Sequence, residues 1–248
     1  MKTLATDLDG TLYLDNVLIN GVQSAYKSLI LNNFKIFHTT NNSSQSTDVI
    51  ASKLSKLLSI DIDIESIVTP LVVLKEFLKN KNYSLYVYGS KEIKDFVSNI
   101  TNTVKDLDNS DFIIMGRVDS PAQDELDAIA EFIKSGVRGA TLNKDLTYPI
   151  SPTEFKPGNG QIARYVESKS KRQLESFGKE GELYAKYFQD KNISVDYVIG
   201  DRVDTDIIFG NKIGATSVLV QSSVENFMTE DIADKKFKDF AGFVSSII

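Results

Sequence analysis

The stretch Asp7-Leu8-Asp9-Gly10-Thr11-Leu12 closes the first apolar run of the chain. The residues before it, 3–6, read as a short buried strand, and Gly10 reads as the turn that follows. Two carboxylates at positions i and i+2 of a strand point to the same face, and each raises the other's pKa unless a cation sits between them. An acidic turn with a capping Asp is the alternative on local grounds. The pair Asp7 and Asp9 favours a hard cation with oxygen ligands and a carboxylate that can attack phosphorus.

The composition is that of an ordinary soluble globular protein. The chain has 248 residues, 42% hydrophobic and 25% charged, which allows one large domain or two modest ones. A net charge of −6 argues against a general nucleic-acid surface, which needs a basic stripe. With no cysteine and one histidine, His38, the chain excludes disulfides, thiolate catalysis and multi-histidine metal sites. No window approaches the roughly 18 apolar residues of a membrane span, and we expect a cytoplasmic protein.

Strand and helix patterns alternate along most of the chain. Strands are expected at 3–6, 34–38, 85–88, 112–115, 139–142, 197–199 and 215–220, and helices at 22–31, 48–58, 72–78, 92–100, 122–133, 161–167 and 183–188. Such alternation indicates an α/β fold with a mostly parallel sheet. Helix breakers are densest at 149–160. His38 falls inside the second strand, where we expect it to pack rather than to contact a substrate.

Four polar clusters follow apolar runs at the points where strands end. They are Asp7/Asp9, Thr40-Asn41-Asn42, Gly178-Lys179 and Gly200–Asp206. Open parallel sheets bind ligands outside the carboxyl ends of their strands. Each cluster alone also fits a plain structural explanation: an N-cap turn, a solvated lysine or a helix start rich in Asp. Together they predict a phosphoryl-transfer site, in which magnesium and lysine neutralise the phosphate and one carboxylate attacks it.

The four clusters resemble the motifs of the haloacid dehalogenase superfamily of aspartate-nucleophile phosphatases. Residues 7–13 resemble its DxDGxL motif, 40–43 its second motif, 178–179 its GKP motif and 200–207 its GDxxxTD motif. Glu180 stands where the third motif usually has proline. Lys156-Pro157-Gly158 competes for that third motif, but no apolar strand precedes it, so the role is assigned to Lys179.

Two further stretches narrow the resemblance to the p-nitrophenyl phosphatase or NagD-like branch. Residues 140–145 are similar to its TNxD stretch and residues 157–162 to its PGxGSI stretch. The resemblance implies a Rossmann-like core formed by residues 1–79 and 174–248. An α/β cap, residues 80–173, is then inserted between the two parts of the core.

The resemblance also implies a role for each residue of the site. Asp7 attacks phosphorus, Asp9 serves as general acid and then general base, and Asp206 orients the metal shell. Asp9 contributes its backbone carbonyl to the metal. The implied catalytic residues are Asp7, Asp9, Thr40 and Lys179, the phosphate contacts are Gly10, Thr40, Asn41, Asn42 and Lys179, and the Mg²⁺ ligands are Asp7, Asp9, Asp201 and Asp206.

The implied function is a magnesium-dependent phosphomonoester hydrolase that forms an aspartyl-phosphate. Its substrate is expected to be a small phosphorylated metabolite, such as a sugar phosphate, a phosphoglycolate-like acid or a nucleotide. No nucleic-acid or membrane partner is expected, and a homodimer through the cap is allowed. The alternatives on the same fold are a phosphotransferase and a sugar-phosphate-binding protein without turnover. A dehalogenase needs no magnesium, and a receiver module is about half this length without an inserted domain.

Overall fold

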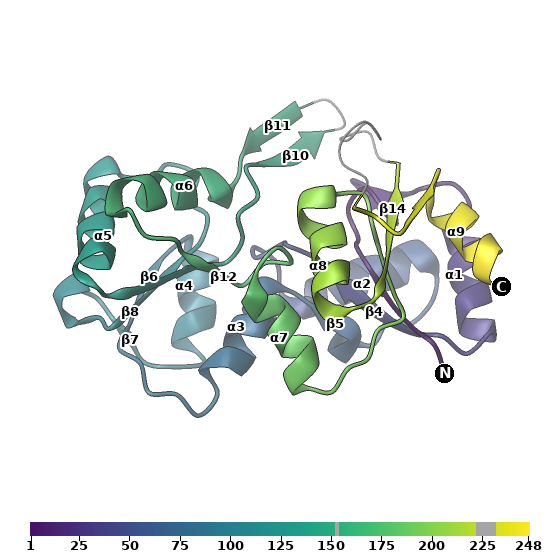
Figure 1. Ribbon diagram of the computed structural model, residues 1–248, viewed down its shortest axis with the longest axis horizontal. Coiled ribbons are helices and arrows are strands. Elements are labelled where there is room, and N and C mark those ends of the chain that lie inside the picture. The colour runs from purple at the N-terminus through teal and green to yellow at the C-terminus, as the bar shows by residue number, and fades with distance from the viewer. Residues whose placement is uncertain (152–153, 222–231) are drawn as a thin grey trace. The chain divides into compact units, whose positions relative to one another are not determined.

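The chain divides into two compact units in the computed structural model, which describes residues 1–151, 154–221 and 232–248 (Figure 1). The first unit contains Met1–Thr40, Gln45–Thr69 and Phe188–Ile248. The second contains Asn41–Ser44 and Pro70–Tyr187, so nearly all of it is inserted between the two parts of the first. The predicted domain bounds, 1–79 with 174–248 and 80–173, stay a prediction.

The first unit is built on a six-stranded sheet whose neighbouring strands are all parallel. In spatial order the strands are β15 (Lys235–Phe237), β14 (Thr216–Val220), β13 (Tyr197–Gly200), β1 (Thr3–Thr6), β4 (Lys35–Thr39) and β5 (Ile67–Val68). The helices within this unit are α1 (Val22–Leu31), α2 (Thr47–Leu58), α8 (Ile208–Ile213) and α9 (Phe240–Ile247), and a small antiparallel hairpin joins β2 (Tyr13–Leu14) to β3 (Val17–Leu18). Every residue of β1 is buried, as expected for a central strand of a covered parallel sheet.

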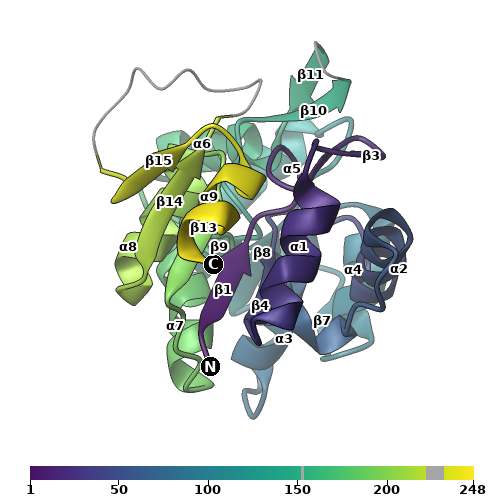
Figure 2. The same ribbon diagram turned by 90° about the vertical axis from the view of Figure 1, so that its right-hand side faces the viewer.

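Helix α1 covers one face of this sheet because its apolar residues recur at helical spacing. The buried ones are Val22, Ala25, Tyr26 and Leu29, which form a single stripe. Helix α9 packs beside α1, and Figure 2 shows both in front of β1 and β13. The apolar core under these helices includes Leu4, Ile199 and Phe243.

The second unit contains a five-stranded sheet, also with parallel neighbours throughout. Its strands in spatial order are β12 (Glu175–Ser176), β9 (Arg138–Thr141), β8 (Phe112–Met115), β6 (Leu85–Tyr88) and β7 (Thr103–Val104). The helices are α3 (Pro70–Leu78), α4 (Lys91–Ser98), α5 (Gln123–Ser135) and α6 (Asn159–Ser170), while α7 (Glu182–Asp190) crosses from the second unit into the first. The predicted fold class, a parallel-sheet α/β core with an inserted α/β part, is confirmed.

Several short elements escape the sequence patterns. The segment rich in helix breakers forms an antiparallel hairpin of β10 (Thr147–Ser151) and β11 (Glu154–Pro157). A two-stranded ribbon leaves one edge of each strand without a strand neighbour, so proline, which lacks an N–H, is tolerated there. The edge strands β5, β7 and β15, of two or three residues each, are too short to show a period.

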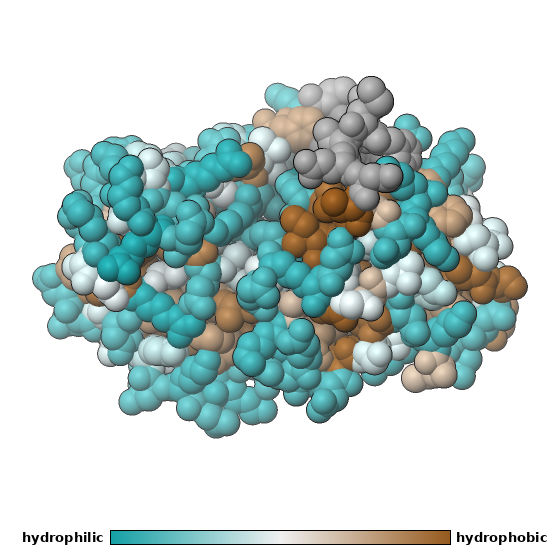
Figure 3. All heavy atoms as spheres, viewed as in Figure 1, coloured by the Kyte–Doolittle hydropathy of each residue, from teal (hydrophilic) through white to brown (hydrophobic). Residues whose placement is uncertain are grey.

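No helix in the described ranges has both the length and the apolar character that crossing a membrane requires. Most residues on the face drawn in Figure 3 are hydrophilic, and apolar residues gather there only in small patches.

His38 packs inside β4, as expected, and is 1% exposed. Its Nδ1 lies 2.9 Å from Ser66 Oγ and its Nε2 lies 3.0 Å from the Tyr26 hydroxyl. Because Ser66 donates its hydroxyl proton to the Asp63 carbonyl at 2.6 Å, it accepts a proton from Nδ1. A neutral imidazole protonated at Nδ1 leaves Nε2 to accept from the Tyr26 hydroxyl. Burial lowers the pKa of His38 from 6.5 to about 4.

We expect the His38 imidazole to make stability depend on pH. In the unfolded chain this imidazole is protonated below pH 6.5, whereas in the folded chain it is protonated only near pH 4. The stabilisation of the folded state by neutral His38 is therefore fully present above pH 6.5 and is lost as the pH falls towards 4. Between pH 7.5 and pH 5 the free energy of unfolding should fall by about 2 kcal/mol through this group. Urea unfolding at both pH values checks this, with His38→Gln as the comparison. The wild type and the variant should differ in pH dependence, and parallel curves would contradict the assignment.

Candidate active site

Three adjacent strands of the six-stranded sheet end in predicted site residues. Strand β1 lies between β13 and β4. Asp7 follows β1 directly, Thr40 follows β4 and Asp201 follows β13. Because parallel strands all finish at the same edge of a sheet, these side chains gather at the edge where open α/β sheets bind ligands.

Three buried carboxylates form a group that could hold a metal ion. Asp7 is 6% exposed, Asp201 is 3% and Asp206 is 0%. One carboxylate oxygen from each lies within 4.8 Å of the other two. Three such charges repel one another strongly away from water, and hard oxygen donors suit Mg²⁺ or Ca²⁺. The donor set therefore fits a hard divalent cation.

Glycines make this close approach of carboxylates possible. A Cβ on Gly10 would lie 2.3 Å from Asp201 Oδ2, and Gly10 also has a φ of +91°, which other residues rarely adopt. A Cβ on Gly200 would lie 2.1 Å from Asp206 Cγ. Both glycines of the sequence motifs are thus required by the neighbouring carboxylates.

Asp7 is fixed at both its backbone and its side chain. Its N–H donates to the Ile199 carbonyl of β13 at 2.8 Å, which continues the sheet one residue past β1. The Thr11 hydroxyl donates to Asp7 Oδ2 at 3.0 Å. Sequence reasoning gave Thr11 no role, although its position four residues after Asp7, across the glycine turn, was a usable signal.

Asp9, unlike the three buried carboxylates, is exposed. The Tyr13 hydroxyl donates to Asp9 Oδ2 at 3.3 Å, and the Lys53 ammonium lies 3.9 Å from the Tyr13 ring centroid. Burial, then the charges of Asp9 and Asp7, raise the pKa of Tyr13 far above its ordinary value, so this hydroxyl stays a donor. The metal contact predicted for Asp9, its backbone carbonyl, stays a prediction.

Asp206 lies in one turn of π-helix, Val203–Ile207, that leads into α8. The Arg202 N–H donates to Asp206 Oδ2 at 3.2 Å, and the Asp206 N–H donates back to the Arg202 carbonyl at 3.0 Å. Asp204, the third acid of this cluster, is exposed and pairs with the Arg202 guanidinium at 2.7 Å. The cluster therefore divides into two buried acids, Asp201 and Asp206, and one solvated ion pair.

Thr40 and Asn42 belong to the turn after β4 but to different units. Thr40 is 4% exposed, and its N–H donates to the Val68 carbonyl of β5 at 3.1 Å. Asn42 Oδ1 accepts from both the N–H and the hydroxyl of Ser44, each at 2.9 Å. The Asn42 side chain thus closes its own turn, and its predicted phosphate contact stays a prediction.

Asn41 and Lys179 lie together in the second unit, both buried. The Lys179 N–H donates to Asn41 Oδ1 at 2.8 Å, and Asn41 Nδ2 donates to Asp145 Oδ1 at 2.9 Å. Lys179 is 2% exposed, whereas Lys156, the competing lysine, lies in β11 and is exposed. Burial of an ammonium group needs a compensating role, which supports the choice of Lys179.

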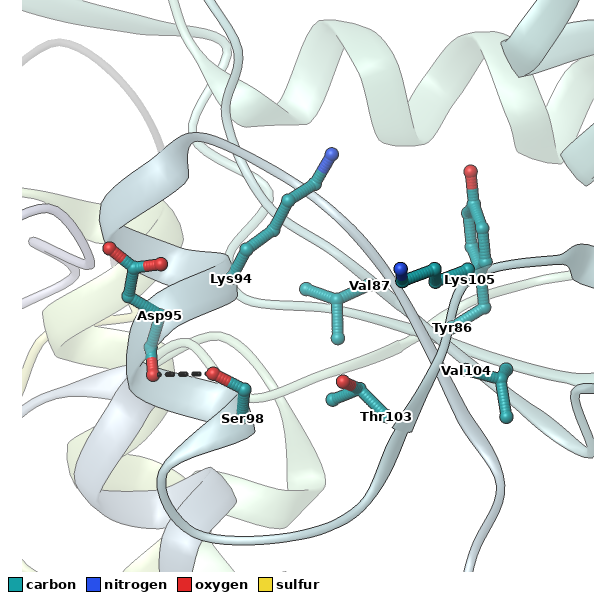
Figure 4. A pocket seen from close by; sticks show the side chains of 8 residues that line it. All are labelled: Tyr86, Val87, Lys94, Asp95, Ser98, Thr103, Val104 and Lys105. Carbon is teal, nitrogen blue, oxygen red and sulfur yellow. Dashed lines mark hydrogen bonds between the residues drawn. The ribbon is translucent and has the colours of Figure 1, made fainter.

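A pocket of about 300 Å³ in the second unit is lined by none of the predicted site residues (Figure 4). It lies between α4 and the strands β6 and β7. Three of its polar side chains have partners: the Tyr86 hydroxyl donates to Glu125 at 2.6 Å, Asp95 pairs with Lys91, and the Ser98 hydroxyl donates to the Asp95 carbonyl at 3.0 Å. The lining residues are Tyr86, Val87, Lys94, Asp95, Ser98, Thr103, Val104 and Lys105.

Comparison with known proteins agrees with this geometry. A family model described as "Haloacid dehalogenase-like hydrolase" matches residues 4–101, and a second, described as "HAD-hyrolase-like", matches residues 183–242. A curated relative, "Acid sugar phosphatase" from Staphylococcus haemolyticus, is 27% identical over 259 residues, covering 99% of this chain and 96% of its own.

Solved structures share the whole fold. The 4-nitrophenylphosphatase of Thermotoga maritima superposes with a TM-score of 0.86 at 23% identity, covering 100% of this chain and 98% of that one. NagD from E. coli K-12 superposes with a TM-score of 0.82 at 23% identity, covering 97% of each chain. The predicted family and the assignment as an enzyme are confirmed: the chain belongs to the haloacid dehalogenase-like hydrolases.

Proposed function

We propose that the chain is a magnesium-dependent phosphatase that hydrolyses a small phosphomonoester through an aspartyl-phosphate on Asp7. The buried carboxylate group of Asp7, Asp201 and Asp206 is the observation that carries this proposal. The names of the relatives, an acid sugar phosphatase and a 4-nitrophenylphosphatase, support a phosphate ester as the substrate. Within that class we propose a sugar phosphate, with a phosphoglycolate-like acid or a nucleotide as further candidates. Pairing of two copies through the cap stays a prediction.

The chemistry begins at the Asp7 carboxylate. It attacks phosphorus, the bond to the leaving oxygen breaks, and the phosphoryl group is held as an acyl phosphate. The Thr11 hydroxyl holds the carboxylate in one orientation, so little reorganisation precedes attack. Mg²⁺, when bound by Asp7, Asp201, Asp206 and the Asp9 carbonyl, would supply charge compensation for the carboxylate and the transferring phosphoryl group.

Proton transfer is the role of Asp9. Its exposed side chain gives its proton to the leaving oxygen and then takes one from the water that hydrolyses the acyl phosphate. The Tyr13 hydroxyl, which remains protonated, holds the Asp9 carboxylate between these two steps.

Thr40, Lys179 and backbone amides are proposed to bind the phosphate oxygens. Because the Asn41 side-chain amide donates to Asp145, the contribution we assign to Asn41 is its backbone N–H, together with that of Asn42. The Gly10 N–H donates to the Tyr13 carbonyl at 2.8 Å, and the phosphate contact predicted for Gly10 stays a prediction. Lys179 offsets the charge of the phosphoryl group.

Asp7→Asn should abolish hydrolysis of p-nitrophenyl phosphate, because the amide cannot attack phosphorus. Asp9→Asn should lower kcat by at least about 10²-fold, since it removes acid–base help only. Steady-state assays with Mg²⁺ and with EDTA measure both effects, and circular dichroism checks that each variant is folded. Wild-type turnover by folded Asp7→Asn would refute the mechanism. Turnover that persists in EDTA would refute the metal requirement.

Mg²⁺ should raise the thermal unfolding midpoint of the wild type. At a concentration of 100 times its Kd, the ion should increase the free energy of unfolding by about 2.7 kcal/mol. Asp201→Asn should lose this response, because one of the three carboxylates that could hold the ion becomes a neutral amide. Asp204→Asn, which alters the solvated acid of the same cluster, should keep the wild-type response. The same Mg²⁺ response in all three proteins would contradict the proposed ligands.

Lys179→Ala should lower kcat by about 10²- to 10³-fold, as expected for loss of one group that stabilises charge in the transition state. Lys156→Ala, on the exposed face of β11, should change kcat less than about twofold. Parallel assays on p-nitrophenyl phosphate compare the two variants. The reverse order of effects would show that Lys156 is the phosphate-binding lysine.

A further inference from the structure

Glu180, which stands in place of the usual proline, uses its carboxylate to join three separate segments of the second unit. Oε1 accepts from the Lys144 N–H at 2.8 Å and from the Ser176 hydroxyl at 2.5 Å. Oε2 accepts from Asn41 Nδ2 at 3.2 Å. Hydrogen bonds to an ionised acceptor are the stronger kind, so this carboxylate ties the three segments together.

The turn that carries Lys179 is shaped around this carboxylate. The Gly181 N–H donates to the Gly178 carbonyl at 2.8 Å, which places Lys179 and Glu180 at the two central positions of the turn. A Cβ on Gly178 would lie 2.5 Å and 2.8 Å from the two carboxylate oxygens of Glu180. Glycine at 178 thus leaves the space into which the Glu180 side chain folds back.

Glu180 also controls the orientation of the Asn41 side chain. Asn41 Nδ2 donates to both Glu180 and Asp145, which directs Oδ1 to the Lys179 N–H. The Asn41 carbonyl accepts from Asn143 Nδ2 at 2.9 Å. Each polar group of the Asn41 side chain is therefore engaged, and the backbones of Asn41 and Lys179 are held in one arrangement.

We propose that Glu180 is a positioning residue for phosphate binding. It acts on Lys179 through the turn that both share and through Asn41. The inference rests on the proposed function, because it requires that Lys179 and the Asn41 backbone bind the phosphate. A carboxylate suits this position because it accepts from all three donors at once, whereas proline offers no side-chain acceptor.

The test uses Glu180→Gln, which keeps the size of the side chain but replaces one acceptor oxygen with a donor. Glu175→Gln is the control, because it removes an exposed carboxylate of the neighbouring strand that pairs with Arg138. For p-nitrophenyl phosphate with Mg²⁺, Glu180→Gln should lower kcat by about 10- to 100-fold, as misplacement of a binding group does, with a smaller change in KM. Glu175→Gln should match the wild type. A wild-type kcat for folded Glu180→Gln would overturn the inference.

A double-mutant cycle separates positioning from a general structural effect. In the Lys179→Ala background, Glu180→Gln should lower kcat by a clearly smaller factor than in the wild type, because only its effect through Asn41 remains. Losses that multiply independently would overturn the inference. If Glu180→Gln does not fold, Ser176→Ala replaces it in the same cycle, since it removes one of the donors and leaves the carboxylate.

Binding of inorganic phosphate in the presence of Mg²⁺ provides a readout that needs no turnover. Glu180→Gln and Lys179→Ala should each weaken this binding about tenfold or more, as loss of a charge-assisted contact does. Equal affinity in the wild type and Glu180→Gln would overturn the inference. Absence of wild-type hydrolysis together with Glu180-dependent phosphate binding would refute the phosphatase and leave the positioning role in place.

Discussion

The close approach of three buried carboxylates is the constraint on which this structure depends. Asp7, Asp201 and Asp206 come from opposite ends of the chain and meet only because β1 lies beside β13. A parallel sheet covered on its faces is stiff enough to hold them together, because close-packed strands cannot relax apart without opening the core. The glycines at 10 and 200 follow from the same requirement, since any side chain there would occupy the space of a carboxylate.

Each unit fixes its polar residues through partners of its own. In the first unit, the Thr11 hydroxyl holds Asp7 and the Tyr13 hydroxyl holds Asp9. In the second, Asn41 holds the backbone of Lys179. Polar groups that are already held in place need no reorganisation when charge develops in the transition state. Such preorganised electrostatic stabilisation is usually the largest single contribution to catalysis. The order within each unit thus exists before a substrate arrives.

The sequence predicts the long, regular parts of this fold well. Strands β1, β6 and β8 were predicted with the bounds that the structure has, because short buried apolar runs between polar residues leave little ambiguity. The hairpin of β10 and β11 was missed, since Pro149 and Pro157 argue against a strand until its edge position is known.

The candidate site shows the same limit of sequence reasoning. Asp7, Asp201 and Asp206 are recognisable because acids at strand ends form a local pattern. The partners of Glu180 are Asn41, Lys144 and Ser176, and the first two lie 139 and 36 residues away, so only the folded chain brings them together.

The pairing of β1 with β13 has a consequence for the nascent chain. The Thr3 N–H donates to the side chain of Asp196, 193 residues later. At a synthesis rate of roughly 5–20 residues per second, about 10–40 s separate the appearance of these two residues. Throughout that interval the edge of β1 that receives β13 has no native partner, and an open strand edge is a site for aggregation. On the ribosome, the N-terminal strand of this enzyme is therefore a segment that a chaperone would protect.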